Sequence, residues 1–429
     1  MNMRATPYFQ TQVIGCGPGA LGLAVAADRL KLLDSLLGQG IAFLEKAPNP
    51  KELFNQRFPF LIESNSIADD FFKSIDSEGA FSETCRNENS RLVFSREGRT
   101  LPLELIKAFM NDLTKAFLEK CCFSGASGIF FGREIDHLQI GEDGSVTSFN
   151  RSGAPIAKSM YAVLATGAGE NLPLHAHGPG NLFHFLPSGE VLSGKFAEIS
   201  REIASGKPII ILGGSHSAFS VALLILDRFG SRLSTGQIQL YHRGVCLYFT
   251  SQREASESGY FLPGAHIFRS TGEVNKFNGL RGRAKNLYQQ VQSGIEMRVS
   301  VKGKNAYADF LAKAEFPALI IQATGYKTRR IGIINHMGVP IRNLHSNKNC
   351  MVDSQCRLLD SSGEILPNLF GIGIGYPRLS ENKELKIGVN FFHGPDGETI
   401  VRQIVSPSKT TVSAETALAS NSNLNGVPS

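Results

Sequence analysis

Small residues near the start of the chain have the spacing of a dinucleotide-binding turn. In QVIGCGPGALGLAVAADRL, Gly15, Gly17 and Ala20 form the pattern G-x-G-x-x-A between an apolar strand and an apolar helix. The first glycine permits a tight turn, the second lets the backbone approach a pyrophosphate, and the helix start offers N–H groups to the anion. We therefore predict that these residues, together with Pro18, bind a dinucleotide.

A carboxylate at the end of the next predicted strand fits the same site. The stretch GIAFLEK places Glu45 and Lys46 directly after a short buried strand. An acidic residue at this position accepts hydrogen bonds from the ribose hydroxyls of a dinucleotide. We assign both residues to the cofactor site, and an ordinary surface position for Glu45 is the alternative.

The succession of strand, glycine turn and helix begins again at residue 207. The stretch KPIIILGGSHSAFSVALLILDRF contains Gly213, followed by Ser215, His216 and Ser217. Ser215 stands where the pattern has its second glycine, and its hydroxyl is able to donate a hydrogen bond to a pyrophosphate. These residues predict a second dinucleotide site.

The strand after this second turn ends in basic residues. GQIQLYHRG places His242 and Arg243 where the first unit has Glu45. Arginine pairs with a 2′-phosphate, which a carboxylate would repel, so the pattern favours NADPH over NADH; an exposed arginine in a turn is the alternative. Because a flavin can store the hydride that a nicotinamide releases, the acid-terminated first site is predicted to bind FAD.

Two such sites require an α/β fold with two Rossmann-like dinucleotide-binding domains. SMYAVLATGAGE and FPALIIQATGY predict buried strands, LPLELIKAFMNDLTKAFLEKCC predicts an amphipathic helix, and REIDHLQIGEDGSVTSF predicts a hairpin. We expect a connection with one short helix over residues 187–207. The expected domains are the first part of a discontinuous FAD domain (1–200), an inserted NADPH domain (206–328), the second part of the FAD domain (329–405) and a C-terminal tail (406–429).

Composition and charge exclude several other classes of function. The chain has 429 residues and a net charge of +6, and its basic residues are spread out, which is typical of a solvated surface and not of a nucleic-acid-binding patch. The seven cysteines include no C-x-x-C, which excludes a dithiol relay and indicates reduced thiols in a cytoplasmic protein. No apolar run is long enough to span a membrane, and no export signal is evident.

The order of these pieces resembles the flavin-dependent monooxygenases with two dinucleotide-binding domains, over roughly residues 10–405. These include the flavin-containing monooxygenases, the Baeyer–Villiger enzymes and the lysine and ornithine N-hydroxylases. GCGPGALGLA is similar to the N-hydroxylase form G-x-G-P-x-x-L-x-L-A, and ATG and ATGY match the strand ends that flank the NADPH domain. HGPGNLFH resembles the F-x-G-x-x-x-H fingerprint through Gly180 and His184, with Gly178 in place of the aromatic residue.

The resemblance implies a reaction and a set of site residues. NADPH would reduce FAD, O2 would add at the flavin C4a, and the resulting hydroperoxide would oxygenate a small metabolite, with N-hydroxylation of an amine as the favoured outcome. In FLIESNSIADDFF, Asn65 takes the place of a catalytic asparagine beside the flavin. The further residues implied are, for the cofactors, Thr166, Gly167, Thr324, Gly325, Gly373 and Asp396, and, for the substrate, Asn275 and Lys276.

Alternatives stay open for parts of this interpretation. Asp396 also suits the N-cap of a helix. A flavoprotein reductase or oxidase without hydroxylation, and a non-enzymatic redox sensor that binds FAD and NADPH, are the competing functions. His175, His177 and His184 lie in a Pro/Gly loop without a carboxylate or cysteine at ligand spacing, so no metal site is predicted. The expected partners are a small-molecule substrate and O2, with no nucleic acid and no membrane, and a homo-oligomer stays open.

Overall fold

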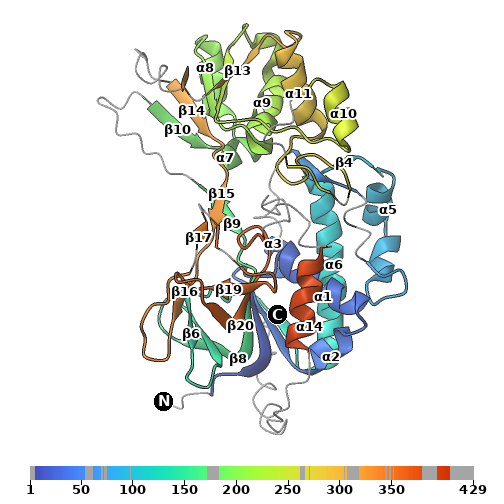
Figure 1. The fold of residues 1–429 in the computed structure, drawn as a ribbon, viewed down its shortest axis with the longest axis vertical. Helices are drawn as coiled ribbons and strands as arrows, with labels where there is room; N and C mark the ends of the chain where they lie inside the picture. The colour runs from blue at the N-terminus through green and yellow to red at the C-terminus, as the bar shows by residue number, and fades with distance from the viewer. Residues whose placement is uncertain are drawn as a thin grey trace.

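The chain folds as two α/β units joined by a narrow connection (Figure 1). The structure is a computed structural model. It describes residues 5–53, 61–68, 71, 75–96, 98–171, 183–260, 266–269, 271–303, 305–306, 318–343, 345–346, 349–350, 352–378 and 394–405. Each unit is built around its own sheet, mixed in the first unit and parallel in the second, and the glycine turns lie at strand ends.

The first unit contains a nine-stranded sheet in which parallel strands form the centre. Along the main path the order is β16-β6-β7-β8-β1-β2-β5, and β20 pairs with β8 and with β19. The bounds are β1 (Tyr8–Ile14), β2 (Ile41–Leu44), β5 (Gly128–Phe130), β6 (His137–Ile140), β7 (Val146–Phe149), β8 (Pro155–Leu164), β16 (Gly332–Ile334), β19 (Arg357–Leu359) and β20 (Ile365–Gly371). The antiparallel pairing of β6 with β7 confirms the predicted hairpin.

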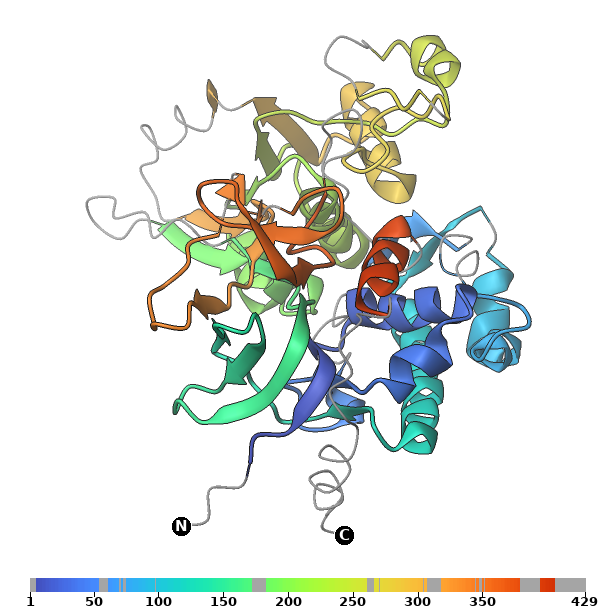
Figure 2. The same ribbon diagram turned by 60° about the horizontal axis from the view of Figure 1, so that its bottom comes forward.

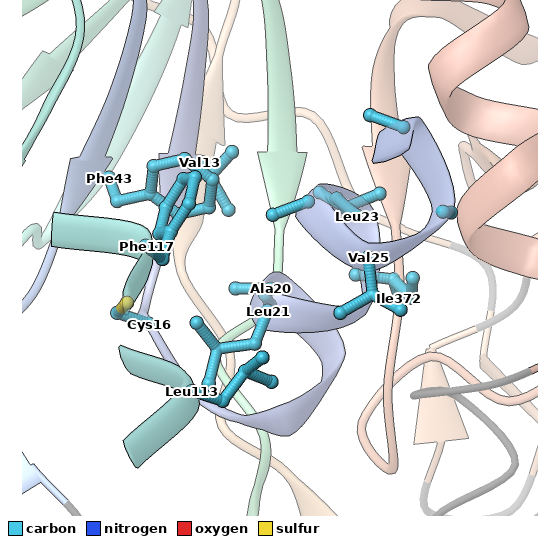
Figure 3. Close-up of a cluster of buried hydrophobic side chains, with 14 of the residues drawn as sticks. Val13, Cys16, Ala20, Leu21, Leu23, Val25, Phe43, Leu113, Phe117 and Ile372 are labelled. Atoms are coloured by element: carbon cyan, nitrogen blue, oxygen red, sulfur yellow. The ribbon is translucent and has the colours of Figure 1, made fainter. Parts of the chain in front are cut away.

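Helices cover one face of this sheet, and Figure 3 shows the core beneath them. Val13 and Phe43 point toward Leu21 and Phe117, whereas Ile14 belongs to the core on the other face. Because both faces are buried, β2 (IAFL) reads as a continuous apolar run. The helices of this unit are α1 (Pro18–Arg29), α2 (Leu33–Gly38), α3 (Pro50–Leu53), α5 (Glu88–Phe94), α6 (Leu103–Ser124) and α14 (Pro395–Ile404).

Helices α1 and α14 cross at close range, side by side in Figure 2. A side-chain carbon built on Gly397 would lie 3.0 Å from the Gly22 carbonyl oxygen, so the close crossing favours a glycine at this position. Arg29 of α1 donates to Glu398 of α14 from both Nε and Nη2, at 2.9 and 2.7 Å. Helix α14, the last described helix, is therefore bound to α1, the helix that follows the first glycine turn.

The second unit has a five-stranded sheet in the order β10-β14-β11-β12-β13, with every pairing parallel. Its strands are β10 (Phe183–Pro187), β11 (Ile209–Leu212), β12 (Ile238–His242), β13 (Val299–Gly303) and β14 (Ala318–Gln322). Its helices are α7 (Ser188–Leu192), α8 (Ala197–Ala204), α9 (His216–Phe229), α10 (Gln252–Glu257) and α11 (Gly282–Gln292). Among described helices, none is long and apolar enough to cross a membrane.

The start of this second unit differs from the expected boundary near residue 200. Strand β10 pairs with β14, so the chain joins the second sheet before the expected connection over 187–207 begins. That connection consists of α7 and α8 where we expected one short helix, and α8 packs on β11 and β14. The strand was missed because it is short and its partner β14 is distant in the sequence.

Two strands, β9 (Ala168–Glu170) and β15 (Tyr326–Thr328), connect the units as an antiparallel pair. Each follows one of the two Ala-Thr-Gly stretches. A second antiparallel pair, β3 (Glu63–Ile67) with β4 (Thr100–Pro102), belongs to the first unit and reaches the helices of the second. A short pair, β17 (His345–Ser346) and β18 (Asn349–Cys350), lies near β15.

Candidate dinucleotide-binding sites

The first glycine turn is held by main-chain contacts that only glycine permits. Gly15 has φ +96°, a conformation that side chains disfavour, and a side-chain carbon there would lie 2.7 Å from the Ala165 carbonyl oxygen. Its N–H donates to the Leu44 carbonyl at 2.8 Å. The turn therefore packs tightly between the ends of β2 and β8.

Helix α1 begins at this turn with an uncapped positive end. Gly17 is the N-cap and Pro18 is the first helical residue, and among the described residues no side chain caps the helix and no acid occupies its first turn. The N–H groups and the helix dipole at such an end favour an anion. Ala20, the third member of the predicted pattern, is fully buried and permits close packing behind the turn.

Glu45 lies where the pattern predicts the ribose-binding acid, and it already has protein partners. Its Oε2 accepts a hydrogen bond from the Cys16 N–H at 2.7 Å, and its Oε1 accepts one from the Ala47 N–H at 2.9 Å. Lys46, between them in sequence, is exposed. The sequence predicts that this carboxylate also contacts ribose hydroxyls. Because only 1% of Glu45 is exposed, such a contact requires a shift of the neighbouring chain.

Two further glycines leave room beside the start of α1. Gly373, after β20, has φ +97°, and Gly167, after β8, has φ +69°. Within the described part of the chain, nothing lies within 4 Å of a side-chain carbon built on either residue. A side-chain carbon on Gly19 would lie 3.4 Å from the Gly373 Cα, so the Gly373 loop lies against the start of α1. The arrangement fits a flavin dinucleotide, which needs both an anion site and a backbone-lined space.

The second glycine turn repeats the construction of the first. A side-chain carbon on Gly213 would overlap the Ala323 carbonyl oxygen, and the Gly213 N–H donates to the Tyr241 carbonyl at 2.9 Å. Ser215 is the N-cap of α9, and no described side chain caps this helix or places an acid in its first turn. Both units therefore present an uncapped helix start beside an Ala-Thr-Gly strand end.

The predicted residues next to Ser215 have partners outside the turn. The His216 Nε2 lies 3.0 Å from the Glu63 carbonyl oxygen of β3. Ser217 hydrogen-bonds to the side chain of Tyr326, whose pKa burial raises to about 12. Ser215 is exposed at the turn. Of the three side chains, Ser215 is therefore the one placed for direct contact with a dinucleotide.

The end of β12 presents the basic residues that the sequence predicts. Burial lowers the pKa of His242, whereas Arg243 is exposed. A side-chain carbon on Gly214 would lie 2.8 Å from the His242 Cβ, so this strand end lies directly against the glycine turn. In the neighbouring strand, Lys302 pairs in register with Tyr241, so its side chain lies on the face opposite His242, where its Nζ donates to the Gln239 Oε1 at 2.9 Å.

The threonine of each Ala-Thr-Gly stretch hydrogen-bonds to the residue that directly follows the other connecting strand. The Thr166 hydroxyl donates to the Arg329 carbonyl, and the Thr324 hydroxyl donates to the Asn171 carbonyl, each at 2.8 Å. Gly325 accepts from the Asn171 N–H at 2.9 Å. Each threonine hydroxyl thus binds the main chain at one end of the β9–β15 pair, where a cofactor contact had been predicted.

Asp396 lies in the first turn of α14, but the N-cap of that helix is Gly394. The N-cap alternative for Asp396 is therefore wrong, because the helix starts at the preceding proline. The carboxylate is buried and forms an ion pair with Arg378, whose other Nη donates to the Ser354 carbonyl at 2.6 Å. Asp396 joins α14 to the segment before it.

The two predicted substrate residues belong to a self-contained loop. Asn275 is 1% exposed and has φ +51°. Its Nδ2 donates to the Leu247 carbonyl and to the Tyr260 hydroxyl, and its Oδ1 accepts from the His266 N–H. Lys276 forms an ion pair with Glu273 at 2.5 Å. The structure corrects the prediction for Asn275, because an amide with all these internal bonds builds the loop.

The remaining predicted positions are only partly described. The backbone of Asn65 lies in β3, on the strand that meets α9. His184, on the edge strand β10, pairs with Glu198 of α8, and its Nδ1 lies 3.0 Å from the Glu198 Oε2. Gly178, Gly180, His175 and His177 lie outside the described residues.

Solved structures of other proteins share this fold. No family model matches the chain. The L-lysine 6-monooxygenase of Pseudomonas syringae aligns with a TM-score of 0.55 at 15% identity, covering 96% of this chain and 100% of that one. The ornithine N-hydroxylase of Kutzneria sp. 744, solved with reduced FAD, NADP+ and L-ornithine, aligns with a TM-score of 0.53 at 14% identity, covering 93% and 99%. These likenesses show the fold.

A sequence relative is similar over a large part of its length. The CMP-5'-(3-aminopropyl)phosphonate hydroxylase of Streptomyces rubellomurinus is 23% identical over 304 residues, which cover 66% of this chain and 68% of that protein.

The predicted fold class, two Rossmann-like domains with the second inserted in the first, is confirmed by the two sheets and by the structural similarity to the lysine and ornithine hydroxylases.

Proposed function

We propose that the protein is an FAD- and NADPH-dependent monooxygenase that hydroxylates the amine nitrogen of a small metabolite. The observation that carries the proposal is the pair of equivalent glycine turns whose neighbouring strands end in opposite charge, Glu45 in one and His242–Arg243 in the other. A carboxylate suits ribose hydroxyls, and a basic pair suits a 2′-phosphate. One chain thus has the parts for both cofactors.

The residues divide into two binding sets. The start of α1, with Glu45, Gly167 and Gly373, would hold FAD, and the start of α9, with Ser215, would hold the NADPH pyrophosphate. His242 and Arg243 would hold the 2′-phosphate. A bound flavin supplies the chemistry that passes electrons from NADPH to O2.

The protein's further task is to bring the two sites together and to exclude water between them. The β9–β15 pair connects the two units, and the threonine bonds close each end of this pair. Amine substrates are favoured because the relatives' names share a terminal amine: lysine, ornithine and an aminopropyl phosphonate. An amine lone pair is a nucleophile toward an activated oxygen.

The purified protein tests this proposal directly. We expect flavin absorbance bands and faster NADPH oxidation with one of four amines: L-lysine, L-ornithine, 3-aminopropylphosphonate or its CMP ester. Mass spectrometry should show one added oxygen atom on the amine. Absence of flavin binding after reconstitution with FAD would overturn the proposal. NADPH oxidation that yields only hydrogen peroxide with every amine would instead support the competing reductase or oxidase.

A further inference from the structure

His216, the first residue of α9, brings the second glycine turn into contact with the first unit. Its Nε2 lies 3.0 Å from the main-chain oxygen of Glu63, the first residue of β3. Because a carbonyl oxygen only accepts hydrogen bonds, Nε2 carries the proton. Within the described chain, the buried Nδ1 has no hydrogen-bond partner, and burial lowers the pKa of this histidine. The ring is therefore a neutral donor aimed at one atom of the other unit.

The side chain of Glu63 extends the same contact to a second helix. Its Oε2 accepts a hydrogen bond from the Thr100 hydroxyl of β4 at 2.7 Å. A side-chain carbon on Gly282, the first residue of α11, would lie 3.3 Å from the Thr100 Oγ1 and 3.8 Å from the Glu63 Oε2. The carboxylate thus faces the positive end of α11, which is the favourable arrangement for an acid. One residue of β3 meets the starts of both α9 and α11.

The space at this junction is too small for a metabolite. The cavity bordered by Glu63, Thr100, His216 and Arg281 measures about 30 Å³. Ligand pockets are roughly ten times larger, so this junction fastens the two units and does not receive the substrate. The contact nevertheless lies beside Ser215, at the predicted pyrophosphate site, and on the strand that carries the backbone of Asn65.

We propose that His216 is a positioning residue that couples NADPH binding to the placement of β3. Its ring holds β3 against the start of α9, so a pyrophosphate bound at that start stabilises the docked strand, and the docked strand strengthens binding of the pyrophosphate. Such coupling is reciprocal by thermodynamic necessity. The role in NADPH binding rests on the proposed function, whereas the docking of β3 does not.

A set of three substitutions separates the hydrogen bond from the bulk of the ring. The amide nitrogen of Gln reaches the place of Nε2, whereas that of Asn reaches only the place of Nδ1, so H216Q should restore the bond and H216N should not. Hydrogen exchange of the amides in residues 61–68, measured on the purified protein without ligand, is the readout. We expect H216A and H216N to exchange about tenfold faster than wild type, the equivalent of one hydrogen bond, and H216Q to remain within about threefold.

The matched control is His184→Gln. His184 is an exposed histidine of the second unit that pairs with Glu198, and we expect this variant to leave exchange in residues 61–68 unchanged. Equal exchange in the H216N and H216Q variants would overturn the docking role. If H216A fails to fold, the comparison of H216N with H216Q still tests the docking role, because the two amide side chains differ in length and not in polarity.

The effect of added NADP+ on hydrogen exchange measures the coupling itself. Added NADP+ should slow exchange in residues 61–68 in wild type and H216Q but not in H216N, and H216N should raise KM for NADPH several-fold at unchanged flavin content. If NADP+ slows exchange equally in wild type, H216Q and H216N, the proposed coupling is overturned. If the protein binds no flavin and oxidises no NADPH, the proposed function fails, while the ligand-free exchange result still decides the docking role.

Discussion

Thr166 and Thr324 close the two ends of the β9–β15 pair that connects the units. Thr166 ends the stretch that leads into β9 and donates its hydroxyl to Arg329 after β15, and Thr324 precedes β15 and donates to Asn171 after β9, both at 2.8 Å. The two threonines occupy equivalent positions, because each follows an alanine whose carbonyl oxygen packs against a glycine turn, Gly15 in one unit and Gly213 in the other. The connection between the units therefore has an approximate twofold pattern within one chain.

Replacing either threonine by valine should loosen this connection without disturbing either core. Valine has the same shape but cannot donate, and the unpaired carbonyl should reduce the free energy of unfolding by about 1 kcal/mol. Differential scanning calorimetry should also show the two units melting more independently. The control is Thr399→Val, which removes a bond inside α14 to the Pro395 carbonyl. Loss of cooperativity in the control as well would contradict this role.

Substitution of the two turn glycines should affect the two cofactors separately. Gly15→Ala places a carbon against the Ala165 carbonyl and should cost about 1–3 kcal/mol in local packing, with loss of bound flavin. Gly213→Ala presses on the Ala323 carbonyl and should raise KM for NADPH while flavin content stays. Flavin absorbance per protein and steady-state kinetics measure both effects. Gly38→Ala is the matched control, since a carbon there meets nothing described within 4 Å.

Arg243 should discriminate between the two nicotinamide cofactors. Arg243→Ala removes an exposed cation from the end of β12, so KM for NADPH should rise about tenfold or more and KM for NADH should stay within twofold. The control is Arg253→Ala on α10, an exposed arginine paired with Glu257. An equal rise for both cofactors in Arg243→Ala would assign this arginine to another role.

Stability should depend on pH through His216. Burial lowers the pKa of this histidine below 6.5 in the folded protein, so the unfolded chain binds the extra proton first as the pH falls. Stability from this group is present above pH 6.5 and decreases as the pH falls below that value. Urea unfolding at pH 7 and pH 5 should show a smaller loss for His216→Gln than for wild type. An equal loss in both proteins would mean that His216 does not contribute.

The parts predicted from the sequence are those that local sterics and periodicity govern. Gly15 was recognisable because a positive φ and a close backbone contact at a strand end leave no room for a side chain. The hairpin of β6 and β7, the helix α6 and the contrast between Glu45 and Arg243 depend likewise on short stretches of chain. The roles of these residues toward the cofactors stay predictions.

The tertiary structure decided the partners of side chains that lie far apart in the sequence. His216 meets Glu63, and Asp396 meets Arg378, although nothing in the local pattern distinguishes these residues from a cofactor ligand. Asn275 shows the same effect, since its amide is consumed by distant segments of its own loop. The sequence by itself therefore determined two glycine turns and the charge of the strand beside each, because a turn is a local steric event. Only the packing of the two units decided which polar groups face a ligand and which are used to join the units.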